Sequence, residues 1–154
     1  MTNTRRWVSA APFRAHLEHL CAGTEVPWTV VALSAGLPLG LAAQLLDVRS
    51  GRRVQRIAPE FARQVIAVTP EQILALSTTL VPARSAGQAI RRLRRLGWTP
   101  QALARAVRVS IAEVDALEHG LRPTIPALLD LRLAALLATS GSPSGPAPRS
   151  TSAA

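Results

Sequence analysis

The chain has 154 residues, 48% of them hydrophobic, which suffices for one ordinary domain or two small ones. Aromatic residues make up only 3% and Tyr is absent, so the core must consist of Ala, Leu and Val, which favours helices and argues against an all-β protein. The basic residues, 18 and all Arg, outnumber 9 acidic residues and give a net charge of +9. Coding bias is one explanation for Arg in place of Lys, but it does not explain the net charge, which indicates an anionic partner, nucleic acid first.

The residues that usually carry catalysis or hold metals are few. A single cysteine, Cys21, excludes an internal disulfide and a Cys-based metal cluster, so we expect a reducing, cytoplasmic location. His16 and His19 share a helix face without further ligands, and His119 stands alone, so we expect no metal and no cofactor. Because the sequence has no Ser-His-Asp set, Gly-rich phosphate loop or paired carboxylates, we do not expect an enzyme.

Residues 26–46 form a run of 21 residues without a charge, followed by several arginines, which is the length and flanking charge of a membrane span. Pro27, Gly36, Pro38 and Gly40 interrupt this run where a pair of folded helices would need breaks. The pair of helices is therefore the favoured prediction, and we expect no membrane partner. A single-pass membrane protein is the weaker alternative.

Composition divides the rest of the chain. Amphipathic helices are predicted over residues 13–22, 59–68, 88–96 and 123–138. Residues 77–87 carry no helical periodicity and are predicted to connect two halves, while the Pro- and Ser-rich residues 139–154 are predicted to be a disordered tail. We expect an all-α protein with helix-turn-helix domains at residues 1–76 and 88–138, each a bundle of about four helices.

The two halves share one pattern of apolar and small residues, the pattern that lets two helices cross closely around a tight turn. Shifting the first copy by 72 residues gives the second, with small Ala32 and Ala104 at one position and Gly36 and Arg108 at the turn. The inner positions are Val31, Ala35, Leu37, Ala42 and Leu45 in the first copy and Leu103, Val107, Val109, Val114 and Leu117 in the second.

Local signals place the helices of the second copy. Thr99 before Pro100 is typical of an N-cap followed by Pro at the first helical position. Ser110 with Glu113 three residues later predicts a reciprocal capping box at the start of the next helix.

The string LARAVRVSIAEVDALEHGLRP, residues 103–123, resembles the lambda-repressor-like helix-turn-helix domain, whose second helix usually ends in Glu, a variable residue and Gly. Residues 14–137, about four fifths of the chain, are similar to duplicated helix-turn-helix regulators of actinobacteria and their phages. In those regulators a Gly- and Arg-rich loop follows the first unit, matched by residues 49–68, and a Gly-Trp pair accompanies the second, matched by Gly97 and Trp98. The resemblance implies sequence-specific DNA binding and control of transcription, including repression.

In such a unit the second helix enters the major groove and its outward residues meet base edges. In the first copy only Gln44 can read a base by paired hydrogen bonds, and in the second the candidates are Ser110 and Asp115. Neither helix is a strong reader, so a protein-protein interaction module built on degenerate copies is the alternative function.

Arginines supply the predicted backbone contacts. Arg49, Arg52, Arg53 and Arg56 follow the first recognition helix in a loop that can reach phosphates or a minor groove, and a merely solvated loop is the alternative. The helix that opens the second copy contributes a further set, the phosphate anchors Arg91, Arg92, Arg94 and Arg95. Because residues 123–138 are apolar nearly all round, they are predicted to dock against the first half or to bind a homodimer or protein partner.

Overall fold

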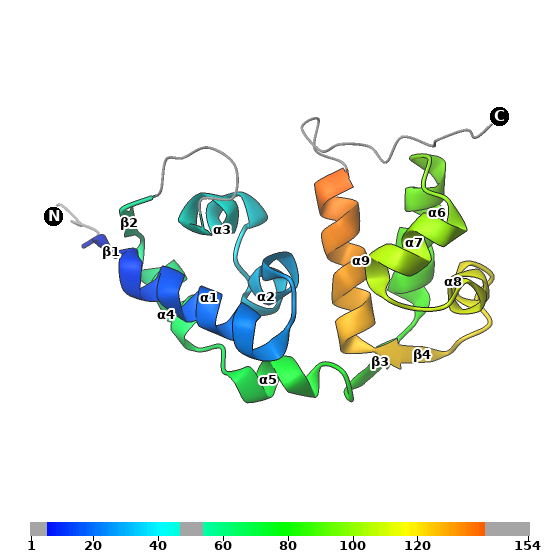
Figure 1. Ribbon diagram of the computed structural model, residues 1–154, viewed down its shortest axis with the longest axis horizontal. Helices are drawn as coiled ribbons and strands as arrows, with labels where there is room; N and C mark the ends of the chain where they lie inside the picture. Colours follow the sequence, from blue (N-terminus) through cyan, green and yellow to red (C-terminus); the bar gives the residue numbers. More distant parts are fainter. Residues whose placement is uncertain (1–5, 47–53, 141–154) are drawn as a thin grey trace, which may run out of the picture. The chain divides into compact units, whose positions relative to one another are not determined.

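The structure, a computed structural model, describes residues 6–46 and 54–140 (Figure 1). These residues are mostly helical, with only two short pairs of strands, which confirms the all-α prediction. The chain divides into two compact units, Met1–Ser77 and Thr78–Ala154.

The first unit begins with strand β1 (Val8–Ser9), which pairs antiparallel with β2 (Arg56–Ile57). Its helices are α1 (Ala11–Thr24), α2 (Trp28–Ala35), α3 (Leu39–Leu46), α4 (Pro59–Ile66) and α5 (Pro70–Ala75). Helix α1 contacts all four of the others. Its inner face therefore organises the core, which includes the fully buried side chains of Leu17, Leu20, Val31, Leu45 and Val65.

The second unit begins with β3 (Leu80–Pro82), which pairs antiparallel with β4 (Thr124–Pro126). Its helices are α6 (Arg84–Arg95), α7 (Pro100–Val107), α8 (Ile111–Glu118) and α9 (Ala127–Ser140). Helix α6 packs on α8 and α9. Aliphatic side chains fill the space between these helices, among them Ile90, Leu93, Leu103, Val114 and Leu133.

Both units contain the order strand, helix, helix, helix, strand, helix, which α5 follows in the first unit (Figure 1). The bounds of α7 and α8 are those of α2 and α3 shifted by the 72 residues that the sequence pattern predicts. The turn has a left-handed residue at the same position in each copy, Gly36 with φ of 75° and Arg108 with φ of 57°. The turns also share one hydrogen bond, from the Leu37 amide to the Ala32 carbonyl (2.9 Å) and from the Val109 amide to the Ala104 carbonyl (3.0 Å).

The structure corrects several details of the sequence prediction. Residues 77–87 were expected to connect the halves, but they contain β3 and the start of α6, so the second unit begins at Thr78. The helix expected over residues 123–138 starts only at Ala127, because residues 124–126 form β4, and it extends to Ser140. Helix α5 was not predicted. The rest of the predicted tail, residues 141–154, lies outside the described residues.

The uncharged run of residues 26–46 forms two helices of eight residues, α2 and α3, separated by a turn at residues 36–38. The prediction of a helix pair is therefore confirmed, and the alternative of a single membrane-spanning helix in this run is wrong. Among the described residues, none of the helices has the length and apolar character needed to cross a membrane.

Candidate nucleic-acid interface

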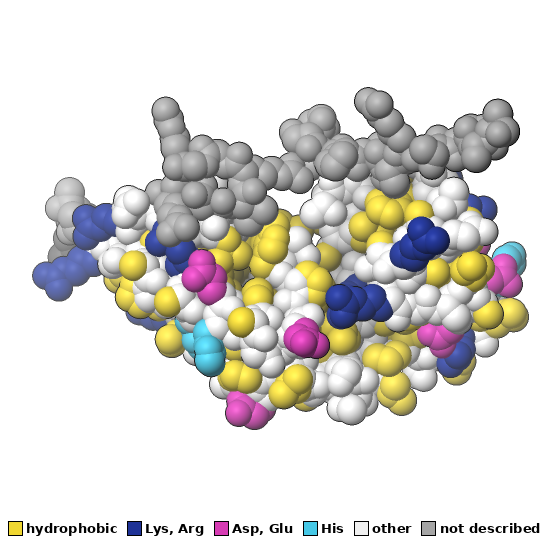
Figure 2. Space-filling view, in the orientation of Figure 1, with side chains coloured by type: hydrophobic (Ala, Val, Ile, Leu, Met, Phe, Trp, Pro, Cys, Tyr) yellow, Lys and Arg dark blue, Asp and Glu magenta, His cyan; other side chains and the backbone are white. Residues whose placement is uncertain are grey.

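Positive charge is unevenly distributed over the described residues. Residues 78–140 of the second unit contain nine arginines and four acidic residues, whereas the described part of the first unit contains four of each. Five of the nine arginines lie on α6. On the face of the molecule shown in Figure 2, basic side chains over the second unit are separated by apolar and uncharged surface. The arginines of α6 are therefore the main basic feature of the described residues.

The amphipathic pattern of α6 explains why its arginines face outward. Ala86, Ile90 and Leu93 follow one another at helical spacing and are fully buried, so the opposite side of the helix faces solvent. Arg84, Arg91, Arg92, Arg94 and Arg95 are all exposed. From Arg84 to Arg95 the helix rises by about 16 Å, the product of eleven steps of 1.5 Å.

Two of the predicted phosphate anchors on α6 already have partners in the molecule. Arg91 donates a hydrogen bond from Nη1 to the carbonyl oxygen of Glu118, the last residue of α8, at 2.9 Å. Arg94 donates from Nη1 to the Trp98 carbonyl at 3.1 Å, and its Nε lies 3.5 Å from the Glu118 carboxylate. These two side chains therefore link α6 to the C-terminal end of α8. The dipole of α8 also stabilises a positive charge at this end.

Arg92 and Arg95, the other two predicted anchors on α6, are differently placed. Both side chains are exposed, and neither makes a hydrogen bond or ion pair with a described residue. All of their guanidinium donors are thus open to an external acceptor such as a phosphate oxygen.

Helix α8, the predicted recognition helix of the second copy, presents an acidic and apolar surface. Ser110 acts as its N-cap, because its Oγ accepts a hydrogen bond from the Glu113 amide at 3.1 Å. The Asp115 carboxylate lies 3.3 Å from Nδ1 of His119, and the side chain of Ile111 is 49% exposed. Within α8 there are three acidic residues and no Arg, and because Glu113 and Glu118 pair with Arg122 and Arg94, Asp115 is the carboxylate left to repel a phosphate backbone.

The predicted capping box at the start of α8 forms only by half. Ser110 makes its bond to the Glu113 amide, but the Glu113 carboxylate pairs with Arg122 in the loop that precedes β4. In a complete capping box the Glu113 carboxylate would accept a hydrogen bond from the Ser110 amide. The Arg122 guanidinium is a charged donor, and a hydrogen bond between two charged groups is stronger than one from a neutral amide. Glu113, in the first turn of α8, is therefore linked to the loop that follows this helix.

In the first copy, Gln44 is exposed on α3, and the rest of this helix carries no charged side chain. Of the arginines predicted in the following loop, Arg49, Arg52 and Arg53 lie outside the described residues. Arg56 lies on β2, is exposed, and donates from Nη2 to the Trp7 carbonyl at 2.9 Å. That bond holds Arg56 against β1 while leaving its charge at the surface.

Sequence analysis missed the role of Arg14 on α1. Its Nε donates to the Leu45 carbonyl at 2.6 Å and its Nη2 to the Val54 carbonyl at 2.8 Å. Arg14 thus fixes the end of α3 to the chain that leads into β2. The signal in the sequence was its position three residues before the buried Leu17, which places an arginine on the inner side of a helix.

One group of residues offers a set of metal-ligand atoms in the described part of the chain. Asp115, Glu118 and His119 each place one such atom within 4.8 Å of the others. These atoms already have partners, since Nδ1 of His119 lies 2.8 Å from the Asp115 carbonyl and Glu118 pairs with Arg94. These contacts are those of the hydrogen-bonded C-terminal turn of α8, and they already engage the atoms that a metal would need.

Comparisons of this chain with protein-family models, with curated proteins and with solved structures find no match.

Proposed function

We propose that the protein binds double-stranded DNA in the cytoplasm and regulates transcription, with α6 as its contact to the phosphate backbone. The observation that carries this proposal is the pair of exposed arginines without a described partner, Arg92 and Arg95, on the helix that opens the second helix–turn–helix copy. A first helix in this position commonly crosses the DNA backbone. The resemblance to duplicated helix-turn-helix regulators supports the same assignment.

The parts of the proposed interface contribute differently. Arg92 and Arg95 supply affinity without sequence information, because phosphates are the same at every base pair. Gln44 on α3 is the proposed base reader, whereas the acidic α8 opposes close approach to the backbone. We therefore propose that binding depends strongly on salt and discriminates only modestly among sequences.

The test is a titration of DNA with the full chain at several salt concentrations. The logarithm of the affinity falls as the logarithm of the salt concentration rises, and each neutralised phosphate contributes about 0.9 to the steepness of this fall. Replacing Arg92 and Arg95 together by Ala should therefore make the fall less steep by about 1.8. The matched control replaces Arg6 and Arg63, two exposed arginines of the first unit, and removes the same charge. A slope that changes equally in the two variants, or in neither, contradicts the role of α6.

A protein-protein interaction module is the second candidate, and the surface of α8 favours it. Ile111, the first residue of α8, is 49% exposed, and Leu121, just after the helix, is 71% exposed. Residues 123–138, the partner surface expected from sequence, are a weaker candidate, because no leucine of α9 is among the exposed side chains. Selection from a random DNA pool separates the two functions, since failure to bind any DNA would favour the module.

A further inference from the structure

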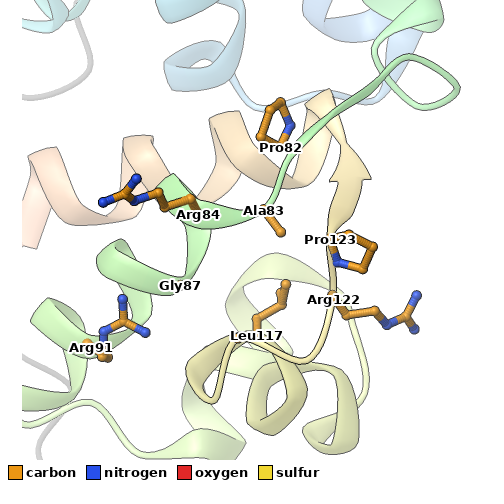
Figure 3. Close-up of a pocket in the computed structure, with 9 residues that line it drawn as sticks. Pro82, Ala83, Arg84, Gly87, Arg91, Leu117, Arg122 and Pro123 are labelled. Atoms are coloured by element: carbon orange, nitrogen blue, oxygen red, sulfur yellow. The ribbon is translucent and has the colours of Figure 1, made fainter.

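The second unit contains a cavity of about 330 Å³ whose walls come from two segments of the chain, residues 82–91 and 117–123. The end of β3 and the start of α6 form one side, and the C-terminal end of α8 with the loop before β4 forms the other (Figure 3). This volume is near the lower limit of natural small-molecule sites, which begin at about 300 Å³. The cavity is therefore large enough for a compact ligand.

The lining combines apolar surface with positive charge. Pro82, Pro123 and Leu117 supply the apolar part, and three arginines supply the charge, Arg84, Arg91 and Arg122. No acidic side chain is among the lining residues. Small-molecule sites likewise combine apolar walls with a small number of polar groups.

The three arginines differ in how far their charge is already compensated. Arg122 pairs with Glu113, and Arg91 donates to the Glu118 carbonyl, which carries no full charge. Arg84 is exposed and makes no hydrogen bond or ion pair with a described residue. Since a guanidinium has five donors, all three arginines retain donors for a further acceptor, and Arg84 retains its whole charge.

Two glycines lie in the wall of the cavity. A Cβ built on Gly87 would lie 2.8 Å from the Leu117 carbonyl, so the wall at this position consists of closely packed backbone. Gly120, with φ of 70°, turns the chain at the opposite wall just after α8. In Figure 3 the Arg84 and Arg122 side chains extend in opposite directions, away from Leu117, which lies between α6 and the segment that leads to β4.

We infer that this cavity binds a small organic anion, a phosphate or carboxylate bearing a compact apolar group. The anionic oxygens would meet Arg84 and the remaining donors of Arg91, which both project from α6, and the apolar group would cover Leu117, Pro82 and Pro123. The inference is independent of DNA binding, because it uses neither Arg92 nor Arg95. Its location at the end of α8 means that a ligand would touch the same helix end that Arg91 holds.

Phenyl phosphate is the probe, titrated into the full chain by calorimetry, because it combines a dianionic group with a compact ring. We expect saturable one-site binding that is tighter than the binding of inorganic phosphate, which lacks the ring, and of phenol, which lacks the charge. Amide chemical shifts of Gly87 and Gly120 should follow the same binding curve. Lack of saturable binding in the millimolar range, or equal binding of inorganic phosphate, would overturn the inference.

The variants locate the site. Arg84→Ala should weaken phenyl phosphate binding about tenfold or more, since one charge-assisted hydrogen bond is worth at least that factor. Arg105→Ala removes the same charge from α7 in the same unit, at a residue that does not line the cavity, and should leave binding unchanged. Equal weakening in both variants would show general attraction by charge and overturn the site. The inference would also be overturned if the chain bound no phenyl phosphate and Arg84→Ala lowered only its DNA affinity.

Discussion

Gly87→Ala should destabilise the second unit, although Ala is the better helix former. Gly87 is buried in α6, and a Cβ at this position would lie 2.8 Å from the Leu117 carbonyl oxygen. Ordinary contact begins near 3.4 Å, so α8 would have to move away by about half an ångström, because a backbone carbonyl cannot rotate aside as a side chain can. The same movement would stretch the hydrogen bond from Arg91 to the Glu118 carbonyl.

The magnitude follows from two opposing contributions. Overpacking of a close contact typically costs about 1–3 kcal/mol, while replacing Gly by Ala inside a helix gains about 1 kcal/mol. We therefore expect a net loss of about 1 kcal/mol in the free energy of unfolding. Gly23→Ala is the matched control, because Gly23 also lies in a helix, α1, and its Cβ would meet nothing within 4 Å. This control should be neutral or stabilising by up to about 1 kcal/mol.

Hydrogen exchange measured by mass spectrometry is the suitable assay, because it reports on the two units separately. Gly87→Ala should speed exchange in peptides from α6 and α8 and leave those from α1 to α4 unchanged, whereas Gly23→Ala should not affect the second unit. If Gly87→Ala protected α6 and α8 as well as or better than the original chain, the close packing of these helices would be refuted.

Substitutions at three further residues test local features of the structure. Arg108→Gly should stabilise the protein by up to about 1 kcal/mol, because Arg108 adopts a left-handed conformation that favours Gly; an unfolding titration that shows a loss would contradict this. Ser110→Ala should cost about 1 kcal/mol by removing the N-cap of α8, and Ser110→Asp should restore it; equal stability of all three forms would exclude a capping role. Burial raises the pKa of Asp130, so the folded state holds this proton more tightly than the unfolded state, and stability falls as pH rises from the carboxyl's ordinary pKa through the raised one. Asp130→Asn should therefore raise Tm at neutral pH, a gain that shrinks on acidification below the ordinary carboxyl range; a gain independent of pH would rule out the carboxylate as its cause.

The sequence predicted local structure well where neighbouring residues decide it. Thr99 and Ser110 cap the helices that they were expected to cap, because an N-cap requires only a side-chain oxygen close to amides two or three residues away. The repeat of 72 residues gave the bounds of α7 and α8 from those of α2 and α3, since helix length and the turn position are encoded by apolar spacing. Arg108 in the place of Gly36 did not change the turn.

The candidate interface was predicted less completely. The sequence placed the α6 arginines on the solvent face correctly, because amphipathic spacing determines which side of a helix is buried. It could not separate Arg92 and Arg95 from Arg91 and Arg94, since the partner of the latter two, Glu118, lies more than 20 residues away in the chain. Nor could it foresee that Glu113 pairs with Arg122, nine residues further along in the loop after α8, in place of half of the expected capping box.

Composition and periodicity alone thus determined that the protein is helical, that its apolar run of residues 26–46 forms two helices, and that one pattern occurs twice. The tertiary structure alone decided the short strand pairs, because a strand of two or three residues has no periodicity and gains its hydrogen bonds only from a partner more than 40 residues away. It also decided that Gly87 faces the Leu117 carbonyl and that Arg84, Arg91 and Arg122 surround one cavity. These contacts depend on how whole helices pack, which the order of residues along any one helix does not specify.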